Sequence, residues 1–134
     1  MSATPRPDLH GLHILVVDDN QDSRAILGAY LEHLGATVTL ARNAGEALAA
    51  LTELHAHVIV IDISMPAIDG TELLRRARTL DAARRTRTPA IAFSGFTGKD
   101  HQEAAREAGF DVFVGKPADP LDIALHIQSL TQDV

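Results

Sequence analysis

Acidic, hydroxyl and basic side chains stand at or just after the ends of the short apolar runs in this chain. Asp18 and Asp19 follow the first run, Asp62 the third, Ser94 the fourth and Lys116 the fifth. Three carboxylates that met at one place would repel one another and raise one another's pKa unless a cation held them, and carboxylate oxygens suit hydrated Mg²⁺. A lysine ammonium and a serine hydroxyl beside that cation would serve the oxygens of a transferring phosphoryl group. The set indicates phosphoryl transfer to a carboxylate, if the fold brings its members together.

The elements that would position these side chains are five apolar runs alternating with five segments of helical periodicity. The apolar runs are too short for membrane helices and have the length of buried strands, at residues 12–17, 37–40, 57–61, 90–93 and 111–114. Helical spacing of hydrophobic residues and end signals predict helices over about residues 26–34, 44–53, 71–80, 97–109 and 120–130.

Local signals mark the ends of several helices. Glycines favour left-handed stops, and short polar side chains favour caps at helix starts. Gly35 and Gly109 mark predicted helix ends. Predicted helix starts are marked by Asn43 with Glu46, by the capping-box spacing of Thr97 and Asp100, and by Asp119 followed by Pro120.

Strands that alternate with helices require crossover connections, and right-handed crossovers with helices on both faces give a doubly wound parallel sheet. The predicted fold class is therefore α/β. Open sheets of this kind place their sites beyond the carboxyl ends of the strands, which is where the chemical residues stand. The length of 134 residues fits one domain, which we predict over residues 12–134 after an N-terminal tail at residues 1–11.

Composition excludes several classes of function. A hydrophobic content of 46% with 22% charged residues is typical of neither a disordered nor a membrane-spanning chain. The net charge of −6 argues against general nucleic-acid binding. The absence of Cys excludes disulfides, thiolate catalysis and Cys-ligated metals. With no secretory signal at the start, we expect a cytoplasmic protein without membrane contact.

Four short motifs resemble the receiver domains of two-component response regulators. They are VVDDN at residues 16–20, IDISMPAIDG at 61–70, FSG at 93–95 and GKP at 115–117. The resemblance covers about residues 12–132 and implies the strand order 2-1-3-4-5 with five flanking helices. IDISMPAIDG together with GFDVFVGKPADP looks most like the receivers attached to hybrid histidine kinases.

The resemblance implies roles for the acidic residues. Asp62 would be the phosphoacceptor, which becomes an acyl phosphate. Asp19 would bind Mg²⁺ directly and Asp18 partly through water, with Asp62 and the backbone carbonyl of Ser64 completing the protein ligands. The implied cofactor is Mg²⁺.

The resemblance also implies a switch. Lys116 would pair with a phosphoryl oxygen, and Ser94 would move inward toward the phosphate and make room for Phe113. Ser94 stands where the family more often has Thr, and Phe113 where it often has Tyr. Ser64 and Phe96 should flank the path of attacking water and tune the lifetime of the phosphate.

These roles imply a self-catalysed phosphoacceptor rather than a turnover enzyme. The phosphoryl donor would be a histidine kinase or a histidine phosphotransfer protein. No DNA-binding domain is encoded, so a separate downstream protein, unknown from the sequence, would receive the output through the surface of the fourth helix, fifth strand and fifth helix. We expect a stand-alone monomer, with dimerisation through that surface as the alternative.

Other interpretations remain beside this one. The chain could be a phosphorylation-independent pseudo-receiver that only binds partners, or a receiver fragment of a hybrid histidine kinase. An aspartyl phosphatase would usually carry a carboxylate where Ser64 stands, and a dinucleotide-binding domain would need glycines where the chain has DDNQD. Six arginines within residues 75–87 could bind a polyanion or an acidic partner, or could form a solvated helix face and loop.

Overall fold

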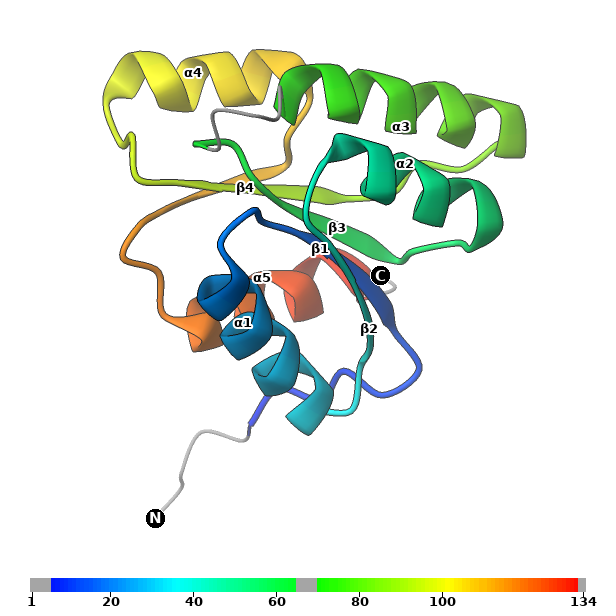
Figure 1. Cartoon of the computed structure of the whole chain (residues 1–134), viewed down its shortest axis with the longest axis vertical. Coiled ribbons are helices and arrows are strands. Elements are labelled where there is room, and N and C mark those ends of the chain that lie inside the picture. Colours follow the sequence, from blue (N-terminus) through cyan, green and yellow to red (C-terminus); the bar gives the residue numbers. More distant parts are fainter. Residues whose placement is uncertain (1–5, 65–69, 133–134) are drawn as a thin grey trace.

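The computed structural model describes residues 6–64 and 70–132 as one α/β sheet domain (Figure 1). Part of the motif at residues 61–70, including Pro66, lies outside the described residues. The elements are β1 (His13–Val17), α1 (Gln21–His33), β2 (Thr37–Ala41), α2 (Ala44–Glu53), β3 (Val58–Asp62), α3 (Gly70–Arg84), β4 (Ala90–Ser94), α4 (Lys99–Ala108), β5 (Val112–Gly115) and α5 (Pro120–Thr131). The alternation predicted from the sequence is confirmed.

The five strands form one parallel sheet in the order β2-β1-β3-β4-β5, which confirms the order implied by the resemblance. The register pairs Asp62 with Phe93, and Ser94 with Gly115. Because the strands are parallel and aligned in this way, their carboxyl ends share one edge of the sheet. The residues that follow the strands are thereby gathered at that edge.

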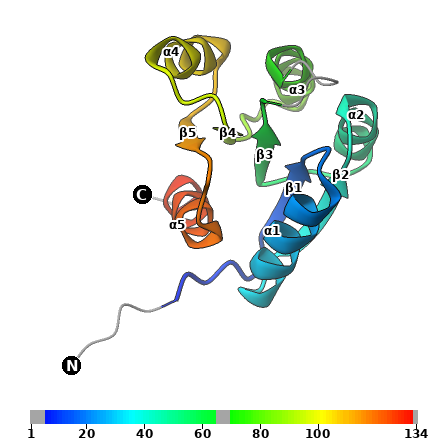
Figure 2. The same ribbon diagram turned by 60° about the vertical axis from the view of Figure 1, so that its left-hand side comes forward.

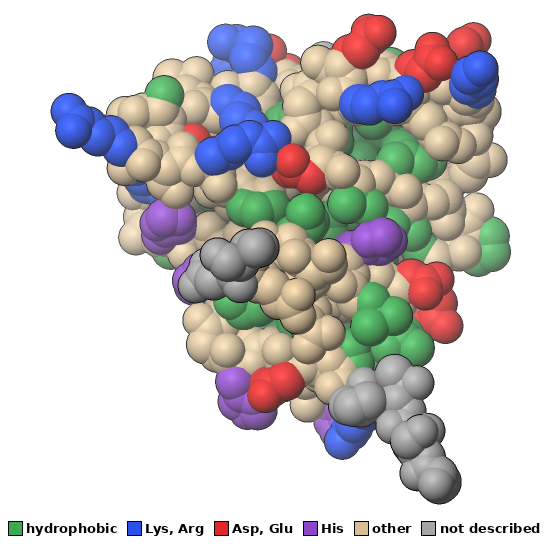
Figure 3. All heavy atoms as spheres, turned by 180° about the vertical axis from the view of Figure 1, so that it is seen from behind, with side chains coloured by type: hydrophobic (Ala, Val, Ile, Leu, Met, Phe, Trp, Pro, Cys, Tyr) green, Lys and Arg blue, Asp and Glu red, His purple; other side chains and the backbone are tan. Residues whose placement is uncertain are grey.

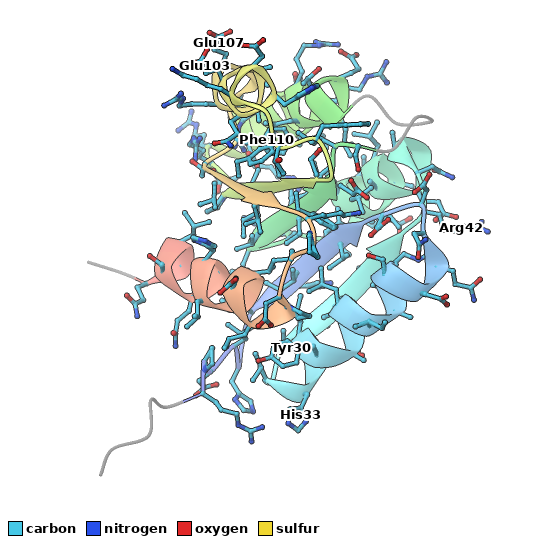
Figure 4. The ribbon with its side chains drawn as sticks, turned by 90° about the vertical axis from the view of Figure 1, so that its left-hand side faces the viewer. Tyr30, His33, Arg42, Glu103, Glu107 and Phe110 are labelled. Carbon is cyan, nitrogen blue, oxygen red and sulfur yellow. The ribbon has the colours of Figure 1, made fainter. Side chains whose placement is uncertain are left out.

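The sheet separates two hydrophobic cores. Alternate residues of each strand point to opposite faces, so Ile14 and Val16 lie in one core while Leu15 and Val17 lie in the other. Helices α1 and α5 cover the first of these cores, and α2, α3 and α4 cover the second, as Figure 2 shows. Figure 4 shows Phe110 beneath α4, whereas Glu103 and Glu107 project from the outer side of that helix.

Most of the predicted helix ends are confirmed. Asn43 accepts a hydrogen bond from the backbone N–H of Glu46, and Asp119 caps α5 in the same way through Leu121. Gly35 and Gly109 follow their helices with φ of 104° and 107°, the left-handed conformation that glycine adopts without strain.

The predicted capping box of Thr97 and Asp100 is wrong. Helix α4 begins at Lys99, its N-cap is Gly98, and no side chain caps it. The backbone carbonyl of Thr97 instead accepts a hydrogen bond from the Gln102 side chain. The spacing of three residues between Thr97 and Asp100 matches the capping-box pattern, but the spacing alone does not determine where α4 begins.

Helix α3 ends at Arg84, beyond the predicted end at residue 80, and a buried polar network accompanies this last turn. Asp81 is 6% exposed and accepts hydrogen bonds from the backbone N–H and the hydroxyl of Thr88, at 2.9 and 2.8 Å. Arg78 donates to Asp81 at 3.0 Å and to the carbonyl of Gly109 at 3.3 Å. The network joins α3 to the start of β4 and to the end of α4.

The described part of the predicted tail packs on the domain. Leu9 is 0% exposed, lies in the core beneath α1 and α5, and its N–H donates to the carbonyl of Leu34 at 2.9 Å. The interpretation of residues 1–11 as a tail did not include this packing, because a single leucine between polar residues carries no periodic signal. Within the described residues, no helix is long and apolar enough to cross a membrane.

Candidate functional site

The carboxyl edge of the sheet brings together the side chains singled out in the sequence. Asp62 and Ser94 are the last residues of β3 and β4, Asp18 follows β1, and Lys116 follows β5. Asp18, Asp62 and Ser94 are buried, with exposures of 0%, 3% and 1%. The backbone hydrogen bonds between neighbouring strands fix the position of residues at the ends of those strands. The sheet therefore gives the site a rigid support.

The three aspartates form one acidic cluster. One carboxylate oxygen from each of Asp18, Asp19 and Asp62 lies within 4.8 Å of the others. Asp18 accepts a hydrogen bond from the N–H of Asn20 at 2.9 Å through Oδ1, but its Oδ2 is buried and has no hydrogen-bond partner among the described residues. A buried carboxylate oxygen without a donor costs free energy unless a cation or water meets it. The donor set is all oxygen, so the cluster fits Mg²⁺.

Asp62 divides its two oxygens between different partners. Its Oδ1 accepts hydrogen bonds from the N–H and the hydroxyl of Ser64, at 2.9 and 2.6 Å. Its Oδ2 lies 2.6 Å from Nζ of Lys116. The carboxylate is therefore oriented by Ser64, paired with Lys116 and placed beside the other two aspartates. The sequence interpretation assigned Ser64 a backbone role and did not foresee the hydroxyl contact.

Lys116 reaches Asp62 from two strands away. Its backbone N–H donates to the carbonyl of Ser94 at 2.7 Å, which extends the pairing of β4 with β5 by one residue, and the peptide bond to Pro117 is cis. Its Nζ lies 4.8 Å from the centroid of the Phe93 ring, a cation–π contact. Phe93 thus supports the ammonium as it crosses β4.

The hydroxyl of Ser94 is engaged by the loop that follows β4. It accepts a hydrogen bond from the N–H of Phe96 at 2.9 Å. The ring of Phe96 is 56% exposed and stacks on His101 of α4 at a centroid distance of 5.4 Å. A Cβ on Gly115 would lie 2.7 Å from Cγ2 of Thr97, so only glycine lets this loop approach β5 so closely.

Phe113 lies apart from the acidic cluster, on β5. It is partly buried and packs against the core beneath α2, α3 and α4. It also borders a hollow of about 260 Å³ between α4 and β5, whose other lining residues are Gln102, Ala105, Arg106, Phe110, Asp111 and Val112.

The sequence interpretation missed Arg24. Its Nη1 donates to the backbone carbonyl of Asp18 at 2.8 Å and so braces the turn that carries the acidic pair. Asn20 caps α1 through the N–H of Ser23 and fixes the same turn from the other side. A single arginine in the first two turns of a helix after an acidic run is the signal that could have found it.

Comparison with known proteins shows the family of this chain. Residues 14–128 match the family described as the response regulator receiver domain. The chain belongs to this family. Receiver domains are signalling switches of two-component systems that interact with histidine kinases or phosphotransfer proteins and generally bind Mg²⁺ at an acidic pocket. This receiver domain carries an acidic cluster, a serine hydroxyl and a lysine at one edge of its sheet.

Relatives of this receiver differ greatly in length. A 14.6 kDa protein of Leptolyngbya boryana, from the sodA1 3' region, is 40% identical over 117 residues, which are 87% of this chain and 88% of the relative. The virulence sensor protein BvgS of Bordetella pertussis is 38% identical over 120 residues, which are 87% of this chain and 10% of BvgS. Among solved structures, the receiver domain of the Francisella response regulator 1452 has a TM-score of 0.80 at 26% identity, over 90% of this chain and 97% of that one.

Proposed function

We propose that this receiver domain is a phosphoacceptor switch that takes a phosphoryl group from a phosphohistidine onto Asp62. The observation that carries the proposal is the setting of the Asp62 carboxylate. One oxygen is held by Ser64 and the other meets the ammonium of Lys116 at 2.6 Å. Asp18 lies in the same acidic cluster, and its Oδ2 has no hydrogen-bond partner among the described residues.

The proposed step is an in-line displacement at phosphorus. A carboxylate oxygen of Asp62 forms the new O–P bond while the P–N bond to the donor imidazole breaks, and the bonding pair leaves with the imidazole. The Nζ of Lys116 pairs with a phosphoryl oxygen as the contact with Asp62 Oδ2 is given up. Mg²⁺, when held by Asp18, Asp19, Asp62 and the backbone carbonyl of Ser64, supplies charge neutralisation. Water later hydrolyses the acyl phosphate, which is autodephosphorylation rather than enzymatic turnover.

The proposed output begins at Ser94. The hydroxyl leaves the N–H of Phe96 and donates to a phosphoryl oxygen, which draws the loop after β4 toward the site. This movement opens space into which Phe113 turns, and the surface of α4, β5 and α5 changes shape. The phosphate thereby shifts a two-state equilibrium by contacts that only one state makes. Because Phe113 has no hydroxyl, the output is read through shape and apolar contact.

A hollow beside the site supports docking of a phosphohistidine partner. It has a volume of about 310 Å³, is mainly apolar, and lies between α1 and the segment after β5, where Lys116 and Pro117 are among its lining residues. Ile26 at its border is 63% exposed. We further propose a cytoplasmic monomer that signals to a separate protein, with dimerisation through α4, β5 and α5 as the alternative.

Intact-protein mass spectrometry after incubation with acetyl phosphate and Mg²⁺ tests the proposal. The native chain should gain the mass of one phosphoryl group, and neither Asp62→Asn nor a sample with excess chelator should do so. Asp122→Asn, which changes an exposed aspartate of α5, is the matched control and should be phosphorylated normally.

Two outcomes would contradict the proposal. Phosphorylation of Asp62→Asn to the native extent would move the phosphoacceptor elsewhere. No gain of mass in the native chain with acetyl phosphate and a panel of phosphohistidine donors would favour the binding-only pseudo-receiver.

A further inference from the structure

A groove runs between α2 and α3, away from the carboxyl edge of the sheet. The two helices lie side by side on one face of the sheet (Figures 1 and 2). The groove has a volume of about 390 Å³ and is lined by Leu48, Thr52, Arg75, Arg76, Thr79 and Leu80. Leu48 and Leu80 are partly buried and pack on the core below, which gives the groove an apolar floor. Arg75 and Arg76 form its rim, with side-chain exposures of 66% and 58%.

The walls of the groove are tied together by Arg84. This side chain crosses from α3 to the end of α2, where its Nη2 donates to the carbonyls of Leu51 at 2.6 Å and Thr52 at 3.3 Å. A cation at a helix C-terminus satisfies carbonyls that have no partner within the helix. The groove is therefore formed before any partner arrives, and a preformed surface loses less entropy on binding.

Hydrogen bonds to Glu72 hold the two rim arginines in place but neutralise only part of their positive charge. Glu72 accepts two N–H groups of Arg75, at 2.7 and 2.8 Å, and one of Arg76 at 3.1 Å. These bonds lower the pKa of Glu72 to about 2, so the carboxylate stays ionised at neutral pH. Among the described residues, the carboxylate of Glu72 faces two guanidiniums of five N–H groups each, which leaves a net positive charge. Exposed ion pairs are weak, so carboxylates of a partner can compete for the same guanidiniums.

The rim belongs to a basic stretch in an otherwise acidic chain. Residues 75–87 hold six arginines and one aspartate, a net charge of +5, while the rest of the chain has six basic and 17 acidic side chains, a net charge of −11. On the face drawn in Figure 3, basic side chains dominate over the end of α3, and acidic ones gather over α4. On this face the basic side chains are thus most concentrated toward the end of α3.

We propose that the groove between α2 and α3 binds an acidic, amphipathic segment of a partner protein. Carboxylates of the segment pair with Arg75 and Arg76, and its apolar side chains cover Leu48 and Leu80. A nucleic acid fits this surface less well, because the floor is apolar and the remainder of the chain repels an extended polyanion. The site is separate from Asp62, so its binding does not depend on phosphotransfer.

Peptide titration of the full chain labelled with ¹⁵N tests the proposal. The probe is a designed helical peptide with Glu on one face and Leu on the other. Two companion peptides carry Lys in place of Glu, or Ser in place of Leu. We expect the Glu/Leu peptide alone to shift the amide resonances of the groove residues, with an affinity that falls as salt is added.

Variants of the protein separate the groove from general charge. Arg75→Gln/Arg76→Gln should weaken binding of the Glu/Leu peptide by about two- to thirty-fold, as expected for the loss of two exposed charge pairs. Arg42→Gln/Arg106→Gln removes the same charge from exposed arginines elsewhere and should leave the affinity within about two-fold.

Three results of the peptide titrations would overturn the proposal, and a fourth would come from an oligonucleotide. The first three are equal shifts with the Lys peptide, unchanged affinity in Arg75→Gln/Arg76→Gln, and no groove shifts at millimolar Glu/Leu peptide. A single-stranded oligonucleotide that shifts the same amides at lower concentration than the peptide would assign the surface to nucleic acid instead. Because none of these measurements involves phosphorylation, they leave the proposed function at Asp62 untouched.

Discussion

The ammonium of Lys116 lies 2.6 Å from Oδ2 of Asp62, although 54 positions separate the two residues in the chain. The contact exists because β3 and β5 flank β4 in a parallel sheet, so their carboxyl ends lie one strand apart. Asp62 is 4% exposed at its side chain and Lys116 is 28% exposed. Lys116 and Asp62 therefore form a partly buried charge pair. The positive charge of Lys116 offsets part of the repulsion among the three aspartates.

Removal of Lys116 should destabilise the domain through the charge left behind. We expect Lys116→Met to lower the free energy of unfolding by about 1–3 kcal/mol, because the buried carboxylate of Asp62 loses its cation. The double variant Lys116→Met/Asp62→Asn should recover most of that loss. Urea denaturation of the four proteins in the cycle measures the coupling, and additive effects of the two substitutions would contradict it.

Asp18 should decide how strongly Mg²⁺ stabilises the fold. In the absence of Mg²⁺, Asp18→Asn should raise the free energy of unfolding by about 1 kcal/mol, because one of three neighbouring negative charges is removed. With Mg²⁺ the native chain should gain stability by mass action and the variant should gain much less. Thermal denaturation with and without Mg²⁺ measures both effects. Equal stabilisation of the two proteins would place the cation elsewhere.

The site could be predicted from the sequence because its members stand at strand ends, and parallel strands bring those ends together. Asp18, Asp62 and Lys116 needed no knowledge of side-chain packing to be placed at one edge. Leu9 contacts distant backbone at Leu34, and Arg24 contacts the neighbouring turn at Asp18. Such contacts produce no periodic pattern in the sequence. The position of the α4 N-cap at Gly98 likewise depends on the path of the loop.

Phe96 is expected to control the lifetime of the phosphorylated form. We predict that Phe96→Ala speeds autodephosphorylation several-fold, because the bulk of the ring obstructs the path of attacking water. His101→Ala is the control, since it removes the stacking partner at 5.4 Å but keeps the ring. The decay of the phosphorylated protein, followed by intact mass, gives the rates. Identical decay of Phe96→Ala and the native chain would remove Phe96 from this role.

Asp81 is expected to matter for stability and not for phosphorylation. Asp81→Ala leaves the buried N–H and hydroxyl of Thr88 without their acceptor and removes the carboxylate that pairs with Arg78. It should lower the free energy of unfolding by about 3 kcal/mol. Asp122→Ala, at an exposed position, should change it by less than about 0.5 kcal/mol. Urea denaturation compares the two. A loss in Asp81→Ala no larger than in Asp122→Ala would show that the network adds nothing.

The Glu72 pairs predict a dependence of stability on pH. Because Arg75 and Arg76 lower the pKa of Glu72 from 4.5 to about 2, the stabilisation is present above pH 4.5 and is lost as pH falls toward 2. The stability difference between the native chain and Glu72→Gln should therefore be constant near neutrality and shrink as pH falls below 4.5. Urea denaturation at a series of pH values measures it, and a difference that grows on acidification would contradict the assignment.

Helix α4 is secured differently at its two ends. Its last turn closes on Gly109, whose carbonyl accepts a hydrogen bond from Arg78, whereas its first turn follows Gly98 with no side-chain cap. The helix can therefore act as a lever with its fulcrum at Gly109. Because the loop after Ser94 joins the helix at the end far from Gly109, a displacement of that loop would tilt the helix, and Lys99 would travel through the widest arc.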